Sequence, residues 1–401
     1  MALATGLFNI NTGNPAELNV RSFAGQILRR FPNGSAPMFA LTSQTGRSKA
    51  KQSTHGYFTK VMTFSTLTVN DADGGLAADV AITVVSTAGV TVGMVYHNPA
   101  TKENIRVSGI TSSTVLAVQR GFGRVAAANF AQGATWIQVG TAFEEGSNRP
   151  AARRLTTAYV PNYTQIFRNA WALTATAKAS MAEMGISNIA ENRNDCSMFH
   201  SVDIESAIVW GQAMMDTTGN TPVHATQGVL DAMEEYCPEN TNAAGATTDY
   251  DELVALVEPA FEYSTNLGDS KSRVGFCDKV ALKVLNQIGR LSGQIQISTA
   301  ETSFGMRFTR FEFYKGTINL IEHPLFNGLG RSGTMLVMDM PALKLAYLEG
   351  RDTVPENYGV DGKSADNGQD AVGGSLTTEL AVELINPYAN CYVTGLTAGA
   401  A

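Results

Sequence analysis

The sequence predicts an α+β fold that contains a small all-β module, either a β-barrel or a sandwich, and three patterns predict it. Between Phe64 and Gly140, apolar residues recur at every second position, in runs about 8 to 12 residues apart. Beyond Pro161, apolar residues recur at the helical period of about 3.6 residues. From Val274 onward, short strand patterns alternate with a further helix. A chain of 401 residues is long enough for two or three domains.

The composition favours a protein that buries much of its surface against other copies of itself. Charged residues make up 16% of the chain, whereas about 25% is usual in globular proteins. Glycine is enriched, with 38 residues. A monomer that depends on charge for its solubility would not have this balance, so we expect extensive self-association.

The charges are unevenly placed along the chain. The net charge of −7 excludes a uniformly basic nucleic-acid coat. Residues 1–60 carry seven lysines and arginines against one glutamate, whereas residues 231–269 carry ten carboxylates and no lysine or arginine. This pattern suits head-to-tail contacts between copies or a basic lining that faces a polyanion. Two solvated faces of one monomer are an open alternative.

The first predicted helix follows Asn14, which would cap its amides together with Glu17, and Pro15 would occupy its first turn. Residues 33–60 are expected to be extended and basic, as an arm or the root of a long loop. In the all-β region that follows, turns are predicted where glycine supplies a positive φ. Its last strand should contain Trp136.

Helices are predicted over residues 166–183, 202–215 and 225–236, the first of them ended by Gly185. Asp249 and Glu252 form the pattern of a capping box for the next helix. In chain order, the remaining predicted elements are a strand at 274–276, a helix at 279–288, strands at 308–314, 317–321 and 334–338, an acidic, glycine-rich loop at 350–374, and a half-buried strand at 377–385.

No motif for catalysis or cofactor binding has its required context. Residues 328–333 match G-x-G-x-x-G, but a strand pattern follows, whereas dinucleotide binding needs a helix. Cys196 and His200 stand four residues apart with no second pair, so a packed cysteine and a hydrogen-bonded imidazole are expected rather than a metal site. The acidic stretch 361–370 has the composition but not the spacing of a calcium loop. We therefore expect no enzyme, no cofactor and no metal.

The four cysteines form no C-x-x-C pair, and the N-terminal residues lack the features of a secretory signal, which indicates a reducing environment. The longest uncharged stretch, 80–101, has strand periodicity, so no transmembrane segment is predicted.

Paired charges are the candidate contact residues. The basic pairs would meet acidic residues of a neighbouring copy or face DNA phosphates, although paired arginines are most often merely exposed. The candidates for contacts between subunits or toward DNA are Arg29, Arg30, Glu144, Glu145, Arg153, Arg154 and Arg351.

A series of short motifs, in order along residues 60–397, resembles one group of tailed-bacteriophage major capsid proteins, the group with a β-rich insertion. The motifs are Ser86-Thr87-Ala88-Gly89, Glu103-x-Ile105-Arg106-Val107, Val118-Gln119-Arg120-Gly121-Phe122-Gly123, Glu144-Glu145-Gly146-Ser147, Asn162-Tyr163-Thr164-Gln165, His323-Pro324, Glu349-Gly350-Arg351-Asp352 and Asn386-Pro387.

The resemblance implies the Hong Kong 97 capsid fold. Its parts would be an N-terminal arm with a helix at 1–50, an E-loop region at 51–160 with the β-barrel insertion at about 64–142, P-domain spine helices at 161–225, an A-domain at 226–375 and a return strand of the P-domain at 376–401. The founding member's crosslinking residues have no match here. A long charged segment, which some relatives use for scaffolding, is missing from residues 1–60.

The function that the resemblance implies is a structural one. The chain would self-assemble as pentamers and hexamers of an icosahedral virion shell around double-stranded DNA, formed in the host cytoplasm. The resemblance also implies portal, scaffolding and cement proteins as partners. It implies no contact with a membrane. A glycan-binding phage adhesin and an encapsulin-like compartment are the alternatives.

Overall fold

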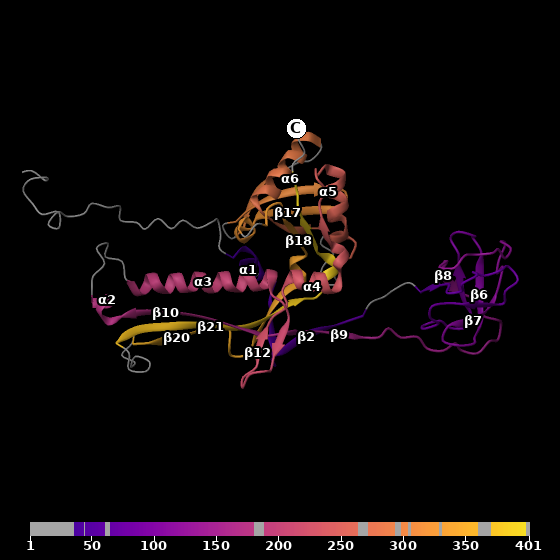
Figure 1. Cartoon of the computed structure of the whole chain (residues 1–401), viewed down its shortest axis with the longest axis horizontal. Coiled ribbons are helices and arrows are strands. Elements are labelled where there is room, and N and C mark those ends of the chain that lie inside the picture. The colour runs from indigo at the N-terminus through magenta and orange to yellow at the C-terminus, as the bar shows by residue number, and fades with distance from the viewer. Residues whose placement is uncertain are drawn as a thin grey trace, which may run out of the picture. The chain divides into compact units, whose positions relative to one another are not determined.

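The computed structural model describes residues 36–43, 45–60, 65–179, 188–263, 272–292, 298–303, 306–328, 331–359 and 370–397. The chain forms two compact units (Figure 1). Unit 1 comprises Met1–Tyr57 and Pro161–Ala401, and unit 2 comprises Phe58–Val160. The helix predicted after Asn14 lies outside the described residues.

Unit 2 is a curled, six-stranded antiparallel sheet, which confirms the predicted all-β insertion. Its strand order is β3-β8-β5-β6-β7-β4. An isolated bridge between Val69 and Val84 joins the ends of the two outer strands, so the sheet curls toward closure. The strands are β3 (Thr66–Thr68), β4 (Ala81–Thr83), β5 (Met94–His97), β6 (Asn104–Ile110), β7 (Val115–Gln119) and β8 (Thr135–Thr141).

The inside of this curled sheet is an apolar core. Met94 and Tyr96 of β5, Ile105 of β6 and Trp136 of β8 are all nearly inaccessible to solvent. They point inward because alternate side chains of a strand face the same side. Trp136 lies in the predicted last strand and packs edge-on against Phe130.

In unit 1, a long helix lies on a five-stranded sheet (Figure 1). The helix, α3 (Asn188–Trp210), has 23 residues. Its sheet contains β1 (Arg47–Ala50), β10 (Gln165–Thr174), β19 (Leu343–Leu348), β20 (Val354–Tyr358) and β21 (Ala371–Leu384). Strand β21 pairs with β10 over ten residue pairs and also with β19 and β20.

The helix predicted over residues 166–183 is wrong, because most of its described part is strand β10. Phe167 and Trp171 are buried against α3, whereas the even-numbered residues face solvent. A spacing of four positions satisfies both a helix and a strand, so these two aromatic residues fit either period. Only Ala175–Ala179, the short helix α2, is helical before the described residues stop at 179.

Residues 33–60 are less extended than predicted. Pro37–Thr42 form a short helix, α1, whose Met38 and Leu41 are buried in the core beneath α3. Strand β2 (Thr54–Thr59) pairs with β9 (Ala158–Tyr163).

The second sheet of unit 1 has seven strands and carries helices α5 and α6 (Figure 1). Its order is β13-β22-β18-β14-β17-β16-β15. The strands are β13 (Thr241–Ala243), β14 (Ser272–Cys277), β15 (Ser298–Ser303), β16 (Met306–Phe313), β17 (Gly316–Glu322), β18 (Met335–Met338) and β22 (Cys391–Thr394). The predicted strands within β14, β16, β17 and β18 are confirmed.

The predicted helices of this region are also found, with shifted ends. They are α4 (Val229–Tyr236), α5 (Tyr250–Val257) and α6 (Lys279–Ser292). Asp249 caps α5 by accepting from the Glu252 amide at 2.8 Å. The Glu252 carboxylate, however, accepts from the Gly245 amide, so only half of the predicted capping box forms.

The region predicted as the loop 350–374 contains β20 and the start of β21. The strand predicted at 377–385 is confirmed within β21, but this strand is buried along most of its length, including Thr378 and Glu379, rather than half-buried. Paired strands and α3 enclose it. The remaining hairpin consists of β11 (Met214–Asp216) and β12 (Val223–Ala225). Short 3₁₀ turns cover 238–240, 258–261, 324–327, 340–342 and 387–389.

Candidate functional site

Three buried carboxylates tie distant segments of the chain together. The side chains of Glu103 and Glu205 are inaccessible to solvent, and Glu379 is 6% exposed. A buried carboxylate is tolerated only when hydrogen bonds or cations compensate its charge. Each of the three is compensated by groups far away in the sequence.

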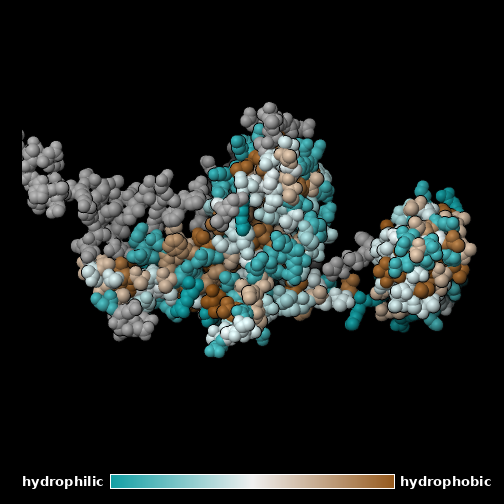
Figure 2. Space-filling model, in the orientation of Figure 1, coloured by the Kyte–Doolittle hydropathy of each residue, from teal (hydrophilic) through white to brown (hydrophobic). Residues whose placement is uncertain are grey.

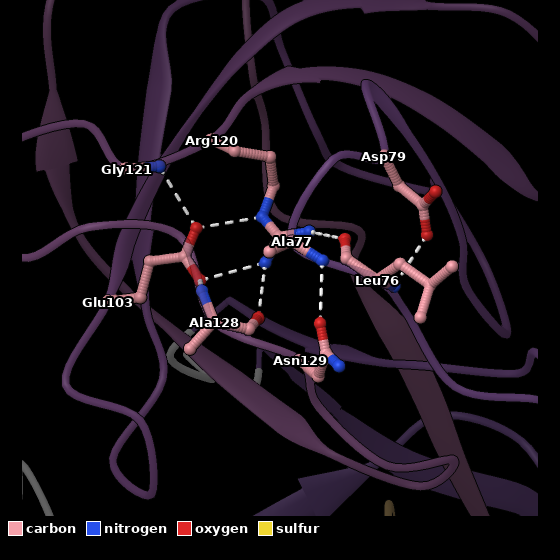
Figure 3. Close-up of polar contacts among 8 residues, drawn as sticks. All are labelled: Leu76, Ala77, Asp79, Glu103, Arg120, Gly121, Ala128 and Asn129. Carbon is pink, nitrogen blue, oxygen red and sulfur yellow. Dashed lines mark hydrogen bonds and ion pairs between the residues drawn. The ribbon is translucent and has the colours of Figure 1, made fainter.

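Glu103, just before β6, accepts four hydrogen bonds in unit 2 (Figure 3). The Arg120 guanidinium donates Nε to Oε1 at 2.7 Å and Nη2 to Oε2 at 2.9 Å. The amides of Gly121 and Ala128 donate at 2.9 and 3.1 Å. Burial alone would raise the pKa of the Glu103 carboxyl, but these hydrogen bonds outweigh it and hold that pKa below its ordinary value.

The other donors of Arg120 fix two irregular loops (Figure 3). Nη1 donates to the carbonyl of Leu76 and Nη2 to that of Ala128, both at 2.6 Å. The guanidinium also lies over the Phe130 ring. Residues 73–80 and 120–130 therefore owe much of their order to one ion pair. Both residues of the pair stand in motifs that the sequence resemblance singled out.

Glu205 of α3 holds the start of α1. Its carboxylate oxygens accept from the amides of Met38 at 2.8 Å and Phe39 at 2.7 Å. His323, after β17, shares a third hydrogen bond with Oε1 at 2.8 Å. Sequence reasoning missed this site. Its signal was a single carboxylate in the apolar run of residues 204–209.

Glu379 of β21 binds a candidate contact residue within the chain. Arg351 Nε lies 2.8 Å from Glu379 Oε2, and the Thr164 hydroxyl donates to Oε1 at 2.8 Å. The Arg351 side chain is nonetheless 45% exposed. Arg351 therefore stabilises the fold of its own chain, and its side chain remains partly exposed to solvent.

The remaining candidates lie after β8, apart from Arg29 and Arg30, which fall outside the described residues. Glu144 is 79% exposed and lies 3.6 Å from Arg106. Residues 144–159 are all exposed, and this stretch contains Glu145, Arg153 and Arg154. Within the described residues, no ion pair links this arginine pair to the glutamate pair.

Cys196 and His200 are packed side chains, as predicted. Cys196 is buried, and the His200 ring is hydrogen-bonded to Asn169 and Thr378. Burial also raises the pKa of Cys237 and Cys391 to about 12, which disfavours reactive thiolates. In the described part of the chain, no cluster of three metal-ligating side chains is found. No helix there is long and apolar enough to cross a membrane.

Comparisons with known proteins identify relatives over nearly the whole chain. A family model described as SU10 major capsid protein matches residues 8–397. The major capsid protein of Pseudomonas phage PaMx41 is 48% identical over 408 residues, which cover 99% of this chain and 97% of that protein.

Solved phage structures are similar at lower identity. The Microbacterium phage Oxtober96 structure has a TM-score of 0.47 and 11% identity, covering 95% of this chain and 96% of that one. The capsid of Myoviridae phage XM1 has a TM-score of 0.46 and 11% identity, covering 96% and 100%.

Proposed function

The chain belongs to the SU10 major capsid protein family, and from that premise we propose how its parts build a shell. It is a major capsid protein of a tailed phage, a non-enzymatic virion component whose copies form an icosahedral shell. The 48% identity across 99% of the chain carries this conclusion. The fold is of the α+β Hong Kong 97 capsid type, and it is the family membership that replaces the adhesin and compartment alternatives.

We propose that the copies assemble as pentamers and hexamers around double-stranded DNA. Ring contacts of this kind are heterologous, which means that two different surfaces of the subunit meet. The low charge content of 16% supports extensive burial between copies. Portal, scaffolding and cement proteins are proposed as further partners.

The proposed capsid domains follow the assignment made from the sequence. The arm would be 1–50, the E-loop region 51–160, the P-domain 161–225 with its return at 376–401, and the A-domain 226–375. Helix α3 would be the spine, and unit 2 the insertion. The Glu205 carboxylate supports this assignment, because it fixes the point at which the proposed arm joins the spine.

The exposed stretch 144–159 is proposed as a contact between copies. It carries Arg149, Arg153 and Arg154, and residues 144–157 have no regular secondary structure. Such a stretch becomes ordered when it lies across a neighbour. The acidic residues of α4 and α5 offer opposite charge, and packaged DNA is the competing partner of the same arginines. Arg29, Arg30 and Arg351 are also proposed to contact either a neighbouring copy or packaged DNA.

Negative-stain electron microscopy of the purified chain, with light scattering for mass, tests the proposal. Closed shells, or rings of five and six copies, are expected. A monodisperse monomer that persists at high concentration and with a scaffolding protein would contradict it. If DNA resists nuclease inside purified virions but not after the shells are opened, this would support the proposal that the shell encloses DNA.

A further inference from the structure

We propose that the hairpin β11–β12 is a contact surface for a second copy of this chain. Met214 and Val223 of one copy would pack on Phe58 and Tyr159 of its neighbour. This inference rests on the proposed function, because it requires that copies assemble. It adds the two surfaces that would meet.

The hairpin is a small sheet on its own. Met214 pairs with Ala225, and Asp216 pairs with Val223, in a two-stranded sheet. An isolated two-stranded sheet is only marginally stable in water and needs a surface to pack against. Strand β10 and Tyr163 supply such a surface for one face of the hairpin, and a neighbouring copy can supply it for the other face.

One face of the hairpin is already covered within the chain. The His224 ring stacks on Tyr163, with ring centroids 6.3 Å apart. Because side chains alternate along a strand, Met214 and Val223 lie on the opposite face. They are diagonal cross-strand neighbours, and their exposed fractions are 58% and 65%. We call Met214 and Val223 the hairpin patch.

The hairpin carries a single charged side chain. Asp216 is the single carboxylate of residues 211–225, which contain no lysine or arginine. Its carboxylate accepts from the amide and hydroxyl of Thr218 at 2.8 and 2.6 Å. These hydrogen bonds occupy the carboxylate within the hairpin but leave its negative charge, which borders the hairpin patch because Asp216 pairs directly with Val223.

Phe58 and Tyr159 form the matching aromatic surface in unit 2. Large apolar side chains are exposed on both units (Figure 2). The Phe58 and Tyr159 rings lie 5.0 Å apart, with exposures of 73% and 46%. Thioether groups pack favourably against aromatic rings.

Among the described residues, the other exposed aromatic side chains have partners within the chain or, like Phe143, form no ring pair. The Tyr314 hydroxyl donates to Glu258 at 2.6 Å, and Tyr263 packs on Tyr388. Phe199 is a single exposed ring on α3. The Phe58 and Tyr159 pair and the hairpin patch are different surfaces, as a ring of copies requires.

Cysteine crosslinking in assembled shells tests the contact. All four native cysteines are buried, so introduced thiols would react first. The double variant Met214→Cys with Tyr159→Cys should link neighbouring copies under oxidation or with a short bismaleimide. Non-reducing gels should then show a ladder that ends at the ring size. Each single variant should remain monomeric, and so should the control pair Val354→Cys with Tyr159→Cys.

Shells that form without this ladder, or with links only inside one chain, would overturn the contact and leave the capsid function intact. Failure of the unmodified chain to assemble would instead count against the proposed function. A second experiment tests the contact if the cysteine variant does not assemble. Met214→Glu with Val223→Glu should abolish shells with an unchanged circular dichroism melt, whereas Asn220→Glu at the hairpin tip should assemble normally. Wild-type shell yield from the double glutamate variant would also overturn the contact.

Discussion

Glu205 Oε1 lies 2.8 Å from His323 Nε2, and both side chains are fully inaccessible to solvent. The carboxylate also receives the amides of Met38 and Phe39. One buried group thus joins α1, α3 and the segment after β17. A cluster of this kind holds three parts of unit 1 in one arrangement.

Glu205→Gln should destabilise unit 1. The glutamine side chain is neutral and offers one acceptor oxygen where the carboxylate has two, so one of the three donors at this site is left buried without a partner. A buried polar group that loses its partner costs about 1 to 3 kcal/mol. Urea denaturation should show this loss, while Glu234→Gln on the exposed side of α4 should change the free energy of unfolding little. Equal stability of the two variants would contradict the role of Glu205.

Arg120→Ala should destabilise unit 2 more strongly. It leaves the Glu103 carboxylate buried without its cation, and breaking a buried ion pair costs about 3 to 5 kcal/mol. Arg120→Lys should cost less, but it cannot restore the two parallel hydrogen bonds. Hydrogen exchange at the Gly121 and Ala128 amides should accelerate in both variants. Arg124→Ala, at an exposed position of the same loop, is the matched control and should leave the exchange rates unchanged.

The strands of unit 2 were predictable because alternation along a strand is local information. At 166–174 a helix was predicted and a strand is found, because there the deciding information is not local. Phe167 and Trp171 are four residues apart, and only their long pairing with β21 decides between the two periods. The buried carboxylate sites could not be predicted as sites. Glu103 and Arg120 are 17 residues apart, and Glu205 and His323 are 118 residues apart.

Glu383 should make the folded protein less stable as the pH falls into the acidic range. The hydrogen bond from His55, at 3.0 Å, lowers the pKa of the Glu383 carboxyl below its ordinary value of 4.5 and outweighs the effect of burial. The unfolded chain therefore binds more protons than the folded chain as the pH falls. The stabilisation is present above pH 4.5 and is lost as the pH falls through the lowered pKa. The free energy of unfolding, measured by urea denaturation at several pH values between about 3 and 7, should depend less steeply on pH for Glu383→Gln than for the unmodified chain. An identical slope would exclude a contribution from this pair.

Val254→Ile should stabilise the region between α5 and its sheet. A small apolar cavity there is lined by Val254, Val257, Leu285, Phe311 and Met335, among others. One added methylene group that fills such a space contributes about 0.8 kcal/mol. Val254→Thr keeps the size and adds a hydroxyl, so it should destabilise. A melting temperature that falls in the isoleucine variant would show that the space cannot accept the extra group.

Charge reversal at Arg153 and Arg154 should reduce the yield of assembled particles. Both side chains are exposed, so Arg153→Glu with Arg154→Glu should leave the folding of unit 2 unchanged while it reverses the charge offered to a partner. The loss should be largest at low salt, because exposed charges are screened as ionic strength rises. Particle yield by sedimentation, at two salt concentrations, measures the effect.

The control for this experiment is Arg124→Glu, which makes a similar change at another exposed position of unit 2. If the acidic residues of a neighbour are the partner, empty shells should already be lost with the Arg153 and Arg154 variant. If packaged DNA is the partner, empty shells should form normally and only the filled particles should decline. Unchanged yields of both empty and filled particles would remove Arg153 and Arg154 from the contact residues.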